Sequence, residues 1–295
     1  MDIKTYLSRK RESVDEALER YFPKSMESQS TLHKAIRYSL FAGGKRIRPI
    51  LSIAAFEAVG AKGEGILPFA CGLEMIHTYS LIHDDLPAID NDDYRRGRPT
   101  CHKVFGEAIA VLAGDGLLTE AFQLMTHPAS LSGSDGLILE LVNEVARAAG
   151  LAGMVIGQVV DIESEGKEID LPTLEYLHTH KTGKMILAAI RVGAKLGGAK
   201  GDTLQALTAY GERIGLAFQI ADDILNVEGN PDVLGKNTGT DAERRKATYP
   251  GVLGLQESKC RGAELVEGAV EALSRFGPEA DPLREIARFI VAREH

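Results

Sequence analysis

The sequence has few cysteines, and their arrangement excludes the usual structural roles. Only Cys71, Cys101 and Cys260 occur among its 295 residues. An odd number of widely spaced cysteines forms neither a disulfide framework nor a Cys-x-x-Cys metal site. We therefore predict a protein of a reducing compartment, the cytoplasm.

An excess of positive charge and long apolar runs are missing as well. Lys and Arg number 34 against 42 Asp and Glu, which gives a formal net charge of −8. This charge argues against a general nucleic-acid binder, because no positive field attracts the phosphate backbone. Apolar runs such as residues 108–113 fall far short of the roughly 20 residues that a membrane-spanning helix needs. The charged start of the chain lacks the apolar core of a signal peptide, so no membrane span is expected.

Signals for β-strands are also scarce, and helical periodicity takes their place. No Asn-Gly or Asp-Gly turn separates two alternating segments. Apolar residues instead recur at spacings of three, four or seven, as in the row Ile3, Leu7, Val14, Leu18 and Phe22. The loops marked by Gly, Pro, Ser and Asp are too short to be interdomain linkers. The prediction is one all-α domain, residues 1–295, with roughly ten or more helices.

Aspartates cluster at the end of an apolar helical stretch. Residues 83–98 contain Asp84, Asp85, Asp90, Asp92 and Asp93, followed by Arg95, Arg96 and Arg98. Carboxylates in this position resist desolvation unless they are paired or bind a metal ion. Pro87 is expected to end or kink the helix, because its ring clashes with the carbonyl of His83. Such a bend would let Asp84 and Asp90 converge on one ion.

A second acidic site follows at residues 218–226. Asp222 and Asn226 are four residues apart and share one helix face. One pair of aspartates on a helix is usually a solvated surface, but two pairs, each after an apolar stretch, favour a functional site. Oxygen ligands without His or Cys select a hard cation such as Mg²⁺. Because Mg²⁺ bridges to phosphates, we predict a diphosphate held between the two sites.

Basic residues supply the complementary charge. Lys45, Arg46 and Arg48 lie in a Gly-Gly turn, where they can present donors to phosphate oxygens. The turn lacks the complete nucleotide-binding P-loop pattern. Lys181 and Lys236 are by themselves weak signals of phosphate binding. His77 alone is typical of a hydrogen-bonded core histidine.

Together these motifs resemble the trans-prenyltransferases, the polyprenyl diphosphate synthases of isoprenoid biosynthesis, and most of all the bacterial farnesyl diphosphate synthases. The resemblance extends over nearly the whole chain, through GGKRIRP, EMIHTYSLIHDDLPAIDNDDYRRGRPT, GMVIGQVVDIESEGK, HKTGKM, FQIADDILN, LGKNTGTD and KATYP. It implies an isoprenoid-synthase helical bundle around a central cavity, acting as a homodimer. It also implies a transferase that joins isopentenyl diphosphate to dimethylallyl or geranyl diphosphate and so makes (2E,6E)-farnesyl diphosphate.

The resemblance also implies roles for individual residues. Three Mg²⁺ ions per active site, replaceable by Mn²⁺, would be held by Asp84, Asp90, Asp161 and Asp222. The allylic diphosphate would contact Arg95, Lys181 and Lys236. The isopentenyl diphosphate would contact Lys45, Arg48, His77 and Arg96. Lys181, Thr182 and Gln219 would act at the reaction centre.

The implied mechanism needs no dedicated protein base. Mg²⁺ and basic side chains neutralise the departing allylic diphosphate, and the resulting cation is attacked by the double bond of isopentenyl diphosphate. The departing diphosphate then takes the proton. One departure from the family pattern is Asn226, where the second motif usually has Asp, so this ion could bind more weakly.

Product length depends on the depth of an apolar channel. Tyr79 lies five residues before Asp84, more than one helical turn deeper, and in the family an aromatic residue there is typical of bacterial C15 synthases. A geranylgeranyl diphosphate synthase is the nearest alternative. A non-catalytic synthase subunit would be expected to lose its Asp motifs, and a terpene cyclase would not be expected to keep the GGKRIRP turn or the Arg95-Arg96 pair.

Overall fold

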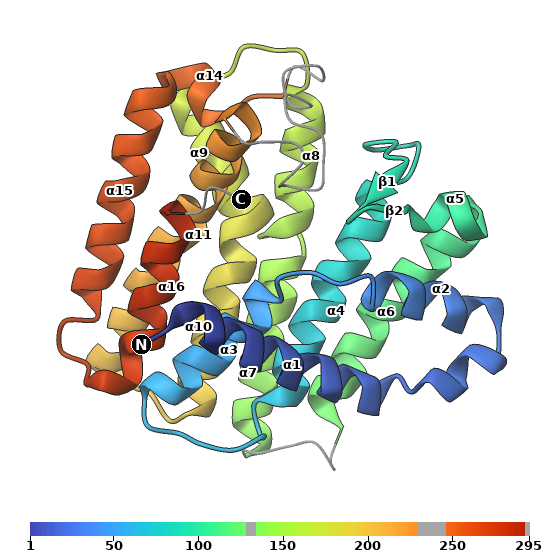
Figure 1. Cartoon of the computed structure of the whole chain (residues 1–295), viewed down its shortest axis with the longest axis horizontal. Coiled ribbons are helices and arrows are strands. Elements are labelled where there is room, and N and C mark those ends of the chain that lie inside the picture. Colours follow the sequence, from blue (N-terminus) through green and yellow to red (C-terminus); the bar gives the residue numbers. More distant parts are fainter. Residues whose placement is uncertain (128–133, 229–245, 293–295) are drawn as a thin grey trace. The chain divides into compact units, whose positions relative to one another are not determined.

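The structure is a computed structural model of the chain, and it describes residues 1–127, 134–228 and 246–292. Helices make up most of this part of the chain, which confirms the predicted all-α class (Figure 1). The chain divides into two compact units. The first unit comprises residues 1–3, 51–63 and 143–295, and the second comprises residues 4–50 and 64–142. The predicted single domain and its central cavity stay predictions.

The second unit is built around two helices that pack together, α4 (Leu67–Asp84) and α6 (Glu107–Thr126). Its other elements are α1 (Ile3–Tyr21), η1 (Lys24–Ser28), α2 (Thr31–Leu40), β1 (Tyr94–Arg95), β2 (Arg98–Pro99) and α5 (Cys101–Phe105). Gly114 lets α6 approach α4 closely, since a Cβ there would lie 2.1 Å from the His83 ring. This close packing positions the end of α4, where the first aspartates lie.

The first unit is organised around the long helix α11 (Gly201–Glu228), which packs against α10 (Lys184–Leu196) and α15 (Leu255–Ala272) (Figure 1). Its other elements are α8 (Met154–Ser164), α9 (Leu171–His178), the π-helix η3 (Thr179–Gly183), α14 (Tyr249–Leu253), η4 (Pro278–Ala280) and α16 (Asp281–Val291). Helices α3 (Ile47–Ala58) and α7 (Asp135–Ala149) each have residues in both units, and α1 has its first residue, Ile3, in the first unit. Tyr210, fully buried on α11, donates a hydrogen bond to the carbonyl of Leu283 at 2.6 Å and so ties α16 to this core.

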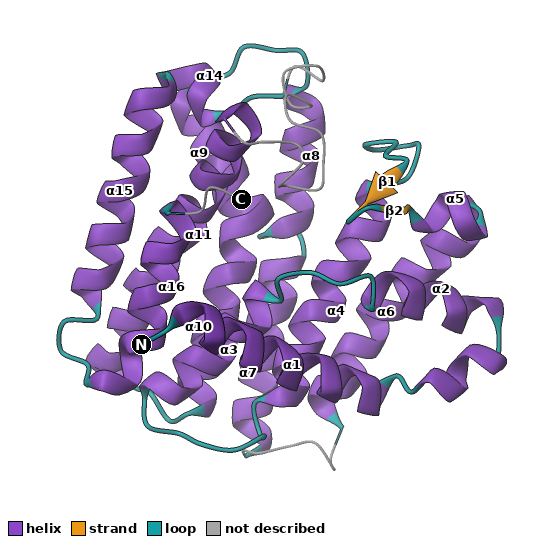
Figure 2. Ribbon diagram, in the orientation of Figure 1, coloured by secondary structure: helices purple, strands orange, loops and turns teal. Residues whose placement is uncertain are grey.

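The helices expected from periodicity are present, with two differences in detail. The sequence Asp202-Thr-Leu-Gln205 predicts a capping box at the start of a helix, but α11 begins at Gly201, so Asp202 lies in its first turn. A two-stranded hairpin, β1–β2, interrupts the helices (Figure 2). Its turn residues Arg96 and Gly97 both have positive φ, 53° and 73°. Primed hairpin turns favour Asn-Gly or Asp-Gly, so an Arg-Gly pair gives no recognisable sequence signal.

Two stretches are long and apolar enough to cross a membrane, Glu107–Thr126 and Asp135–Ser164. Length and composition are weak evidence, because core helices of soluble proteins meet the same criteria. The second stretch is also divided by a turn at residues 150–153, between α7 and α8. The expected absence of a membrane span therefore stays a prediction.

Candidate functional site

The first aspartate cluster lies where α4 ends. As Pro87 predicts, the helix ends at Asp84. The following turn folds back, and the backbone N–H of Asp90 donates to the carbonyl of Asp84 at 2.8 Å. The turn also uses a left-handed residue, Asn91, with φ of 51°. The two residues predicted to share an ion are thus brought together through their backbones, by a turn and not by a kinked helix.

The neighbouring Asp85 forms an ion pair with an arginine. Its side chain is buried, and Arg95 donates to its Oδ1 from Nε at 2.6 Å and from Nη2 at 2.5 Å. Burial raises the pKa of Asp85, against the opposing effect of Arg95. Asp92 lies 3.5 Å from the same guanidinium. Arg95, predicted to contact the allylic diphosphate, is therefore anchored to the aspartate motif by ion pairs that the sequence did not indicate.

Arg96 connects the hairpin to the Gly-Gly turn. Its guanidinium donates a hydrogen bond to the carbonyl of Gly43. A Cβ on Gly44 would lie 2.6 Å from the Arg96 Cζ, and Gly44 has φ of +128°. The backbone conformation therefore favours glycine at this position, and a side chain here would also displace the Arg96 guanidinium. The structure thus brings together two motifs that are about 50 residues apart and that were both predicted to bind isopentenyl diphosphate.

The prediction for Arg46 in this turn is wrong. It was expected to present its donors to a phosphate, yet it is buried and its donors are used inside the protein. It pairs with Glu74 at 2.7 Å and with Asp15 at 2.9 Å, and it donates to the Leu40 carbonyl at 2.7 Å. An unpaired charge would be costly at this depth. Arg46 therefore anchors the turn, while its neighbour Lys45 is exposed.

His77 and Tyr79 occupy the inner part of α4. Burial lowers the pKa of His77 well below its ordinary value, and the positive charges of four arginines lower it further: Arg48, Arg96, Arg95 and Arg46. The imidazole is therefore neutral and lies among the predicted phosphate-binding residues. Tyr79 is buried and meets the His83 ring edge-on, with ring centroids 5.7 Å apart. Burial, followed by the charge of Asp84, raises the pKa of Tyr79 to about 12.

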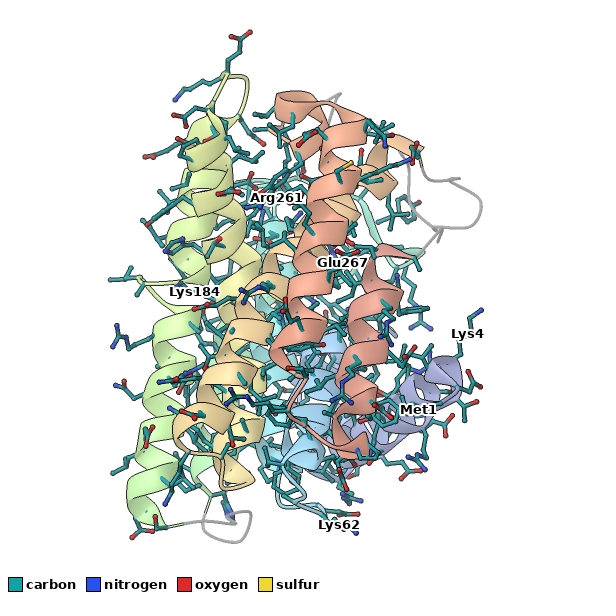
Figure 3. All side chains as sticks on the ribbon, turned by 90° about the vertical axis from the view of Figure 1, so that its left-hand side faces the viewer. Met1, Lys4, Lys62, Lys184, Arg261 and Glu267 are labelled. Atoms are coloured by element: carbon teal, nitrogen blue, oxygen red, sulfur yellow. The ribbon has the colours of Figure 1, made fainter. Side chains whose placement is uncertain are left out.

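In the first unit, Lys181 and Thr182 lie in the π-helix η3, between α9 and α10. Lys184, labelled in Figure 3, is the first residue of α10. Short π-helical segments often occur at functional sites. Here glycines hold the segment from two sides. A Cβ on Gly157 would lie 2.2 Å from the Lys181 nitrogen, and one on Gly215 would lie 2.8 Å from Gly183 Cα.

Asp161, on α8, is paired with two lysines. Lys181 Nζ lies 2.5 Å from its Oδ2, and Lys246 Nζ lies 3.7 Å away. Burial would raise the pKa of Asp161, but the charges of both lysines and the hydrogen bond from Lys181 outweigh burial and lower it. Lys246 was not selected from the sequence, although it begins the KATYP motif. The available signal in the sequence was its positive charge within that motif, because its approach to Asp161 depends on the fold.

The two polar residues predicted at the reaction centre are in contact. The Thr182 hydroxyl donates to Gln219 Oε1 at 3.0 Å. Asp222, the predicted metal ligand on α11, is partly exposed, whereas its neighbour Asp223 is buried. Lys236, predicted to contact the allylic diphosphate, lies outside the described residues.

The predicted Mg²⁺ ligands form two groups. Asp84 and Asp90 belong to the second unit, and Asp161 and Asp222 belong to the first. Within the described part of the chain, no three His, Cys, Asp or Glu side chains lie close enough together to hold a metal ion. Mg²⁺ commonly uses one or two carboxylates and takes its other ligands from water and substrate phosphates. This all-oxygen donor set therefore fits Mg²⁺ that binds together with a diphosphate.

Comparison with known proteins identifies the family. A family model described as polyprenyl synthetase matches residues 29–274. The chain belongs to this family. A farnesyl diphosphate synthase of Geobacillus stearothermophilus is 47% identical over 100% of this chain and 99% of its own. A geranylgeranyl diphosphate synthase of Cyanophora paradoxa is 46% identical, over 99% and 96%.

The solved structures agree with the family assignment. An FPP/GFPP synthase from Zymomonas mobilis is similar with a TM-score of 0.86 and 38% identity, over 98% of this chain and 99% of its own. The all-α fold is thus that of the isoprenyl synthases, and the family makes this polyprenyl synthetase a prenyltransferase.

Proposed function

We propose that this polyprenyl synthetase makes (2E,6E)-farnesyl diphosphate from isopentenyl diphosphate and dimethylallyl or geranyl diphosphate. The observation that carries the proposal is the position of Tyr79. It is buried five residues before Asp84 on the same helix, close enough for the Asp84 charge to contribute to its raised pKa. A hydrocarbon tail whose diphosphate is held at Asp84 would meet this bulky ring after a short distance. The similarity to a farnesyl diphosphate synthase over the whole chain supports the same product.

Substrate binding follows from the two groups of charges. In the second unit, Lys45, Arg48, His77 and Arg96 are proposed to bind isopentenyl diphosphate. Neutral His77 can both donate and accept a hydrogen bond there, so it positions the substrate without adding charge. The allylic diphosphate is proposed to contact Arg95, Lys181 and Lys236.

The chemistry is an ionisation followed by condensation and loss of a proton. The carbon–oxygen bond of the allylic diphosphate breaks, and the electron pair leaves with the diphosphate. The double bond of isopentenyl diphosphate attacks the cation, and a proton is lost to the departing diphosphate. Bound Mg²⁺, three ions per site or Mn²⁺ in its place, supplies positive charge that stabilises the leaving group. Arg95 and Lys181 add cationic donors, and Thr182 and Gln219 line the reaction centre.

Geranylgeranyl diphosphate synthesis is the second candidate, because a relative with that name is almost as similar. Tyr79→Ala distinguishes the two. If the ring limits the channel, the variant should shift at least half of its product from C15 to C20 or longer, as measured by chromatography of the dephosphorylated prenols. Tyr79→Phe keeps the ring and should keep the wild-type C15 profile. A wild-type enzyme that makes C20, or an unchanged profile in Tyr79→Ala, would contradict the proposed limit.

Oligomeric state and location complete the proposal. The family resemblance supports a homodimer in the cytoplasm, without a membrane span. Light scattering after size-exclusion chromatography should give twice the mass of the 31.8 kDa chain. A monomer with full turnover would show that assembly is not needed.

A further inference from the structure

Asp223 is the centre of a buried hydrogen-bond network in the first unit. Its carboxylate accepts hydrogen bonds from three groups. Gln219 Nε2 lies 3.1 Å from Oδ1, whereas His178 Nε2 at 3.0 Å and the Tyr249 backbone N–H at 2.9 Å both contact Oδ2. These donors come from three separate segments: α9, α11 and the start of α14. Because the side chain is 3% exposed, these bonds replace hydration that it has lost.

The donors around Asp223 are themselves held in place. Tyr249 is fully buried, its hydroxyl lies 3.2 Å from Glu175 Oε1, and its ring stacks on His178 with centroids 5.5 Å apart. Glu175 is also 3.5 Å from Arg261, which Figure 3 labels on α15. The carboxylate therefore sits in a rigid set of donors and has little freedom to turn.

The network fixes which way the Gln219 amide faces. An ionised carboxylate accepts hydrogen bonds and donates none. The NH₂ group of Gln219 must therefore face Asp223, four residues further along the same helix. Its carbonyl oxygen then faces Thr182, whose hydroxyl donates to it at 3.0 Å. Without Asp223, the amide could turn over and present its NH₂ group to Thr182.

The direction of this amide determines the sign of charge near Thr182. The carbonyl oxygen carries partial negative charge and the NH₂ group partial positive charge. A fixed dipole acts strongly where water is excluded and charge develops during reaction. An amide in the observed direction favours a developing cation, and the turned amide opposes it.

We propose that Asp223 is a positioning residue for prenyl transfer, which sets the orientation of Gln219 and, through it, of Thr182. The inference rests on the proposed function, because it takes Thr182 and Gln219 to line the reaction centre. In this role Asp223 acts through Gln219 and is not itself a ligand of substrate or metal ion. Its loss should therefore lower kcat and leave the Mg²⁺ requirement unchanged.

Asp223→Asn is the first test. Asparagine keeps the shape and loses the charge, so either end of its own amide can face Gln219. By analogy with the partners that orient metal ligands, whose loss costs on the order of 10–100-fold, kcat should fall by about that factor. The KM for the allylic diphosphate and the Mg²⁺ concentration for half-maximal turnover should stay within about twofold. A rise in the Mg²⁺ requirement that accounts for the whole loss would overturn the proposal.

Coupling to Gln219 separates positioning from a merely structural role. Gln219→Met keeps the size and removes the amide. In that background, adding Asp223→Asn should lower kcat by less than about twofold, because there is no longer an amide to orient. If the loss of kcat in the double variant equals the product of the losses in the two single variants, Asp223 acts independently of Gln219, which contradicts the proposal.

A second variant covers the case in which Asp223→Asn does not fold. His178→Gln removes the imidazole donor and leaves the bond between Asp223 and Gln219. The kcat of His178→Gln should stay within about threefold of wild type. The kcat of Gln219→Met should fall by the same factor as that of Asp223→Asn, about 10–100-fold. Equal losses in the two variants would overturn the proposal. Failure of the proposed function is distinct, since the wild-type enzyme would then make a product other than C15 or no prenyl product, whereas failure of the positioning role shows only in the variants.

Discussion

The two aspartate pairs, one in each unit, are built on the same plan with different partners. In each pair the first member, Asp84 or Asp222, is partly exposed, and the second, Asp85 or Asp223, is buried. Asp85 is held by the guanidinium of Arg95. Asp223 is held by donors from three separate segments. The two members of each Asp-Asp pair are therefore not equivalent: we expect the partly exposed carboxylate to bind the metal ion and the buried one to hold the local structure.

The difference between the buried partners has an energetic consequence. A carboxylate paired with arginine depends on one strong, charge-assisted contact, whereas a carboxylate with three separate donors can lose one and keep two. The first pair should therefore be more sensitive to a single substitution than the second. Four predictions test this comparison, beginning with the largest expected effect.

Asp84→Ala should have the largest effect on activity. It removes a carboxylate proposed to hold Mg²⁺ against the allylic diphosphate, so turnover should fall by about a thousandfold. Asp84 is partly exposed at the end of α4, so the fold should persist. Turnover with saturating Mg²⁺ measures the effect, and far-UV circular dichroism is the control. Turnover within tenfold of wild type would refute the metal assignment.

Arg95→Gln should destabilise the protein more than His178→Gln does. It leaves the buried Asp85 carboxylate without its charged partner, and because Arg95 is partly exposed we expect a loss of about 2 kcal/mol. His178→Gln keeps two of the three donors to Asp223 and should cost about 1 kcal/mol. Urea unfolding of both variants gives the two values. The reverse order would break the comparison between the pairs.

The histidines of the two regions also differ, and pH distinguishes them. His178 contacts a carboxylate, whereas His77 lies among arginines that, together with burial, lower its pKa. With the folded pKa below the ordinary value, neutral His77 contributes stability above about pH 6.5, and this contribution is lost as the pH falls toward the folded pKa. His77→Gln should therefore lose less stability than wild type between pH 7 and pH 5. Urea unfolding at the two pH values measures this difference. If wild type and His77→Gln lose the same free energy of unfolding between pH 7 and pH 5, the predicted effect of His77 is wrong.

Asn226→Asp should have the smallest effect. It restores the carboxylate that is usual at this position of the second motif, one turn after Asp222. Added negative charge should lower the Mg²⁺ concentration for half-maximal turnover by about twofold to threefold. Asn226→Ala is the matched control and should raise it. If Asn226→Asp leaves the Mg²⁺ concentration for half-maximal turnover unchanged, this position does not contribute to metal affinity.

Local features could be predicted from the sequence, and contacts between distant segments could not. Periodicity identified the helical class, and Pro87 identified the end of α4. The burial of Arg46 was missed because its partners, Asp15 and Glu74, are about 30 residues away in either direction. The partners of Asp223 were missed for the same reason, since His178 and the Tyr249 backbone come from other segments of the fold.

The family resemblance supplied most of the candidate site residues, and packing explains how they are held. The contact between Thr182 and Gln219 joins residues that the resemblance placed at one centre. In contrast, nothing in the local pattern separates Asp84 from Asp85, or Asp222 from Asp223. Only burial and hydrogen-bond partners divide each pair.

The most direct test of this division is the Mg²⁺ dependence of turnover in four single Asn variants, at positions 84, 85, 222 and 223. We predict that Asp84→Asn and Asp222→Asn raise the Mg²⁺ concentration for half-maximal turnover by at least about tenfold. Asp85→Asn and Asp223→Asn should lower kcat and leave that concentration within about twofold of wild type. Equal increases in all four variants would contradict the account.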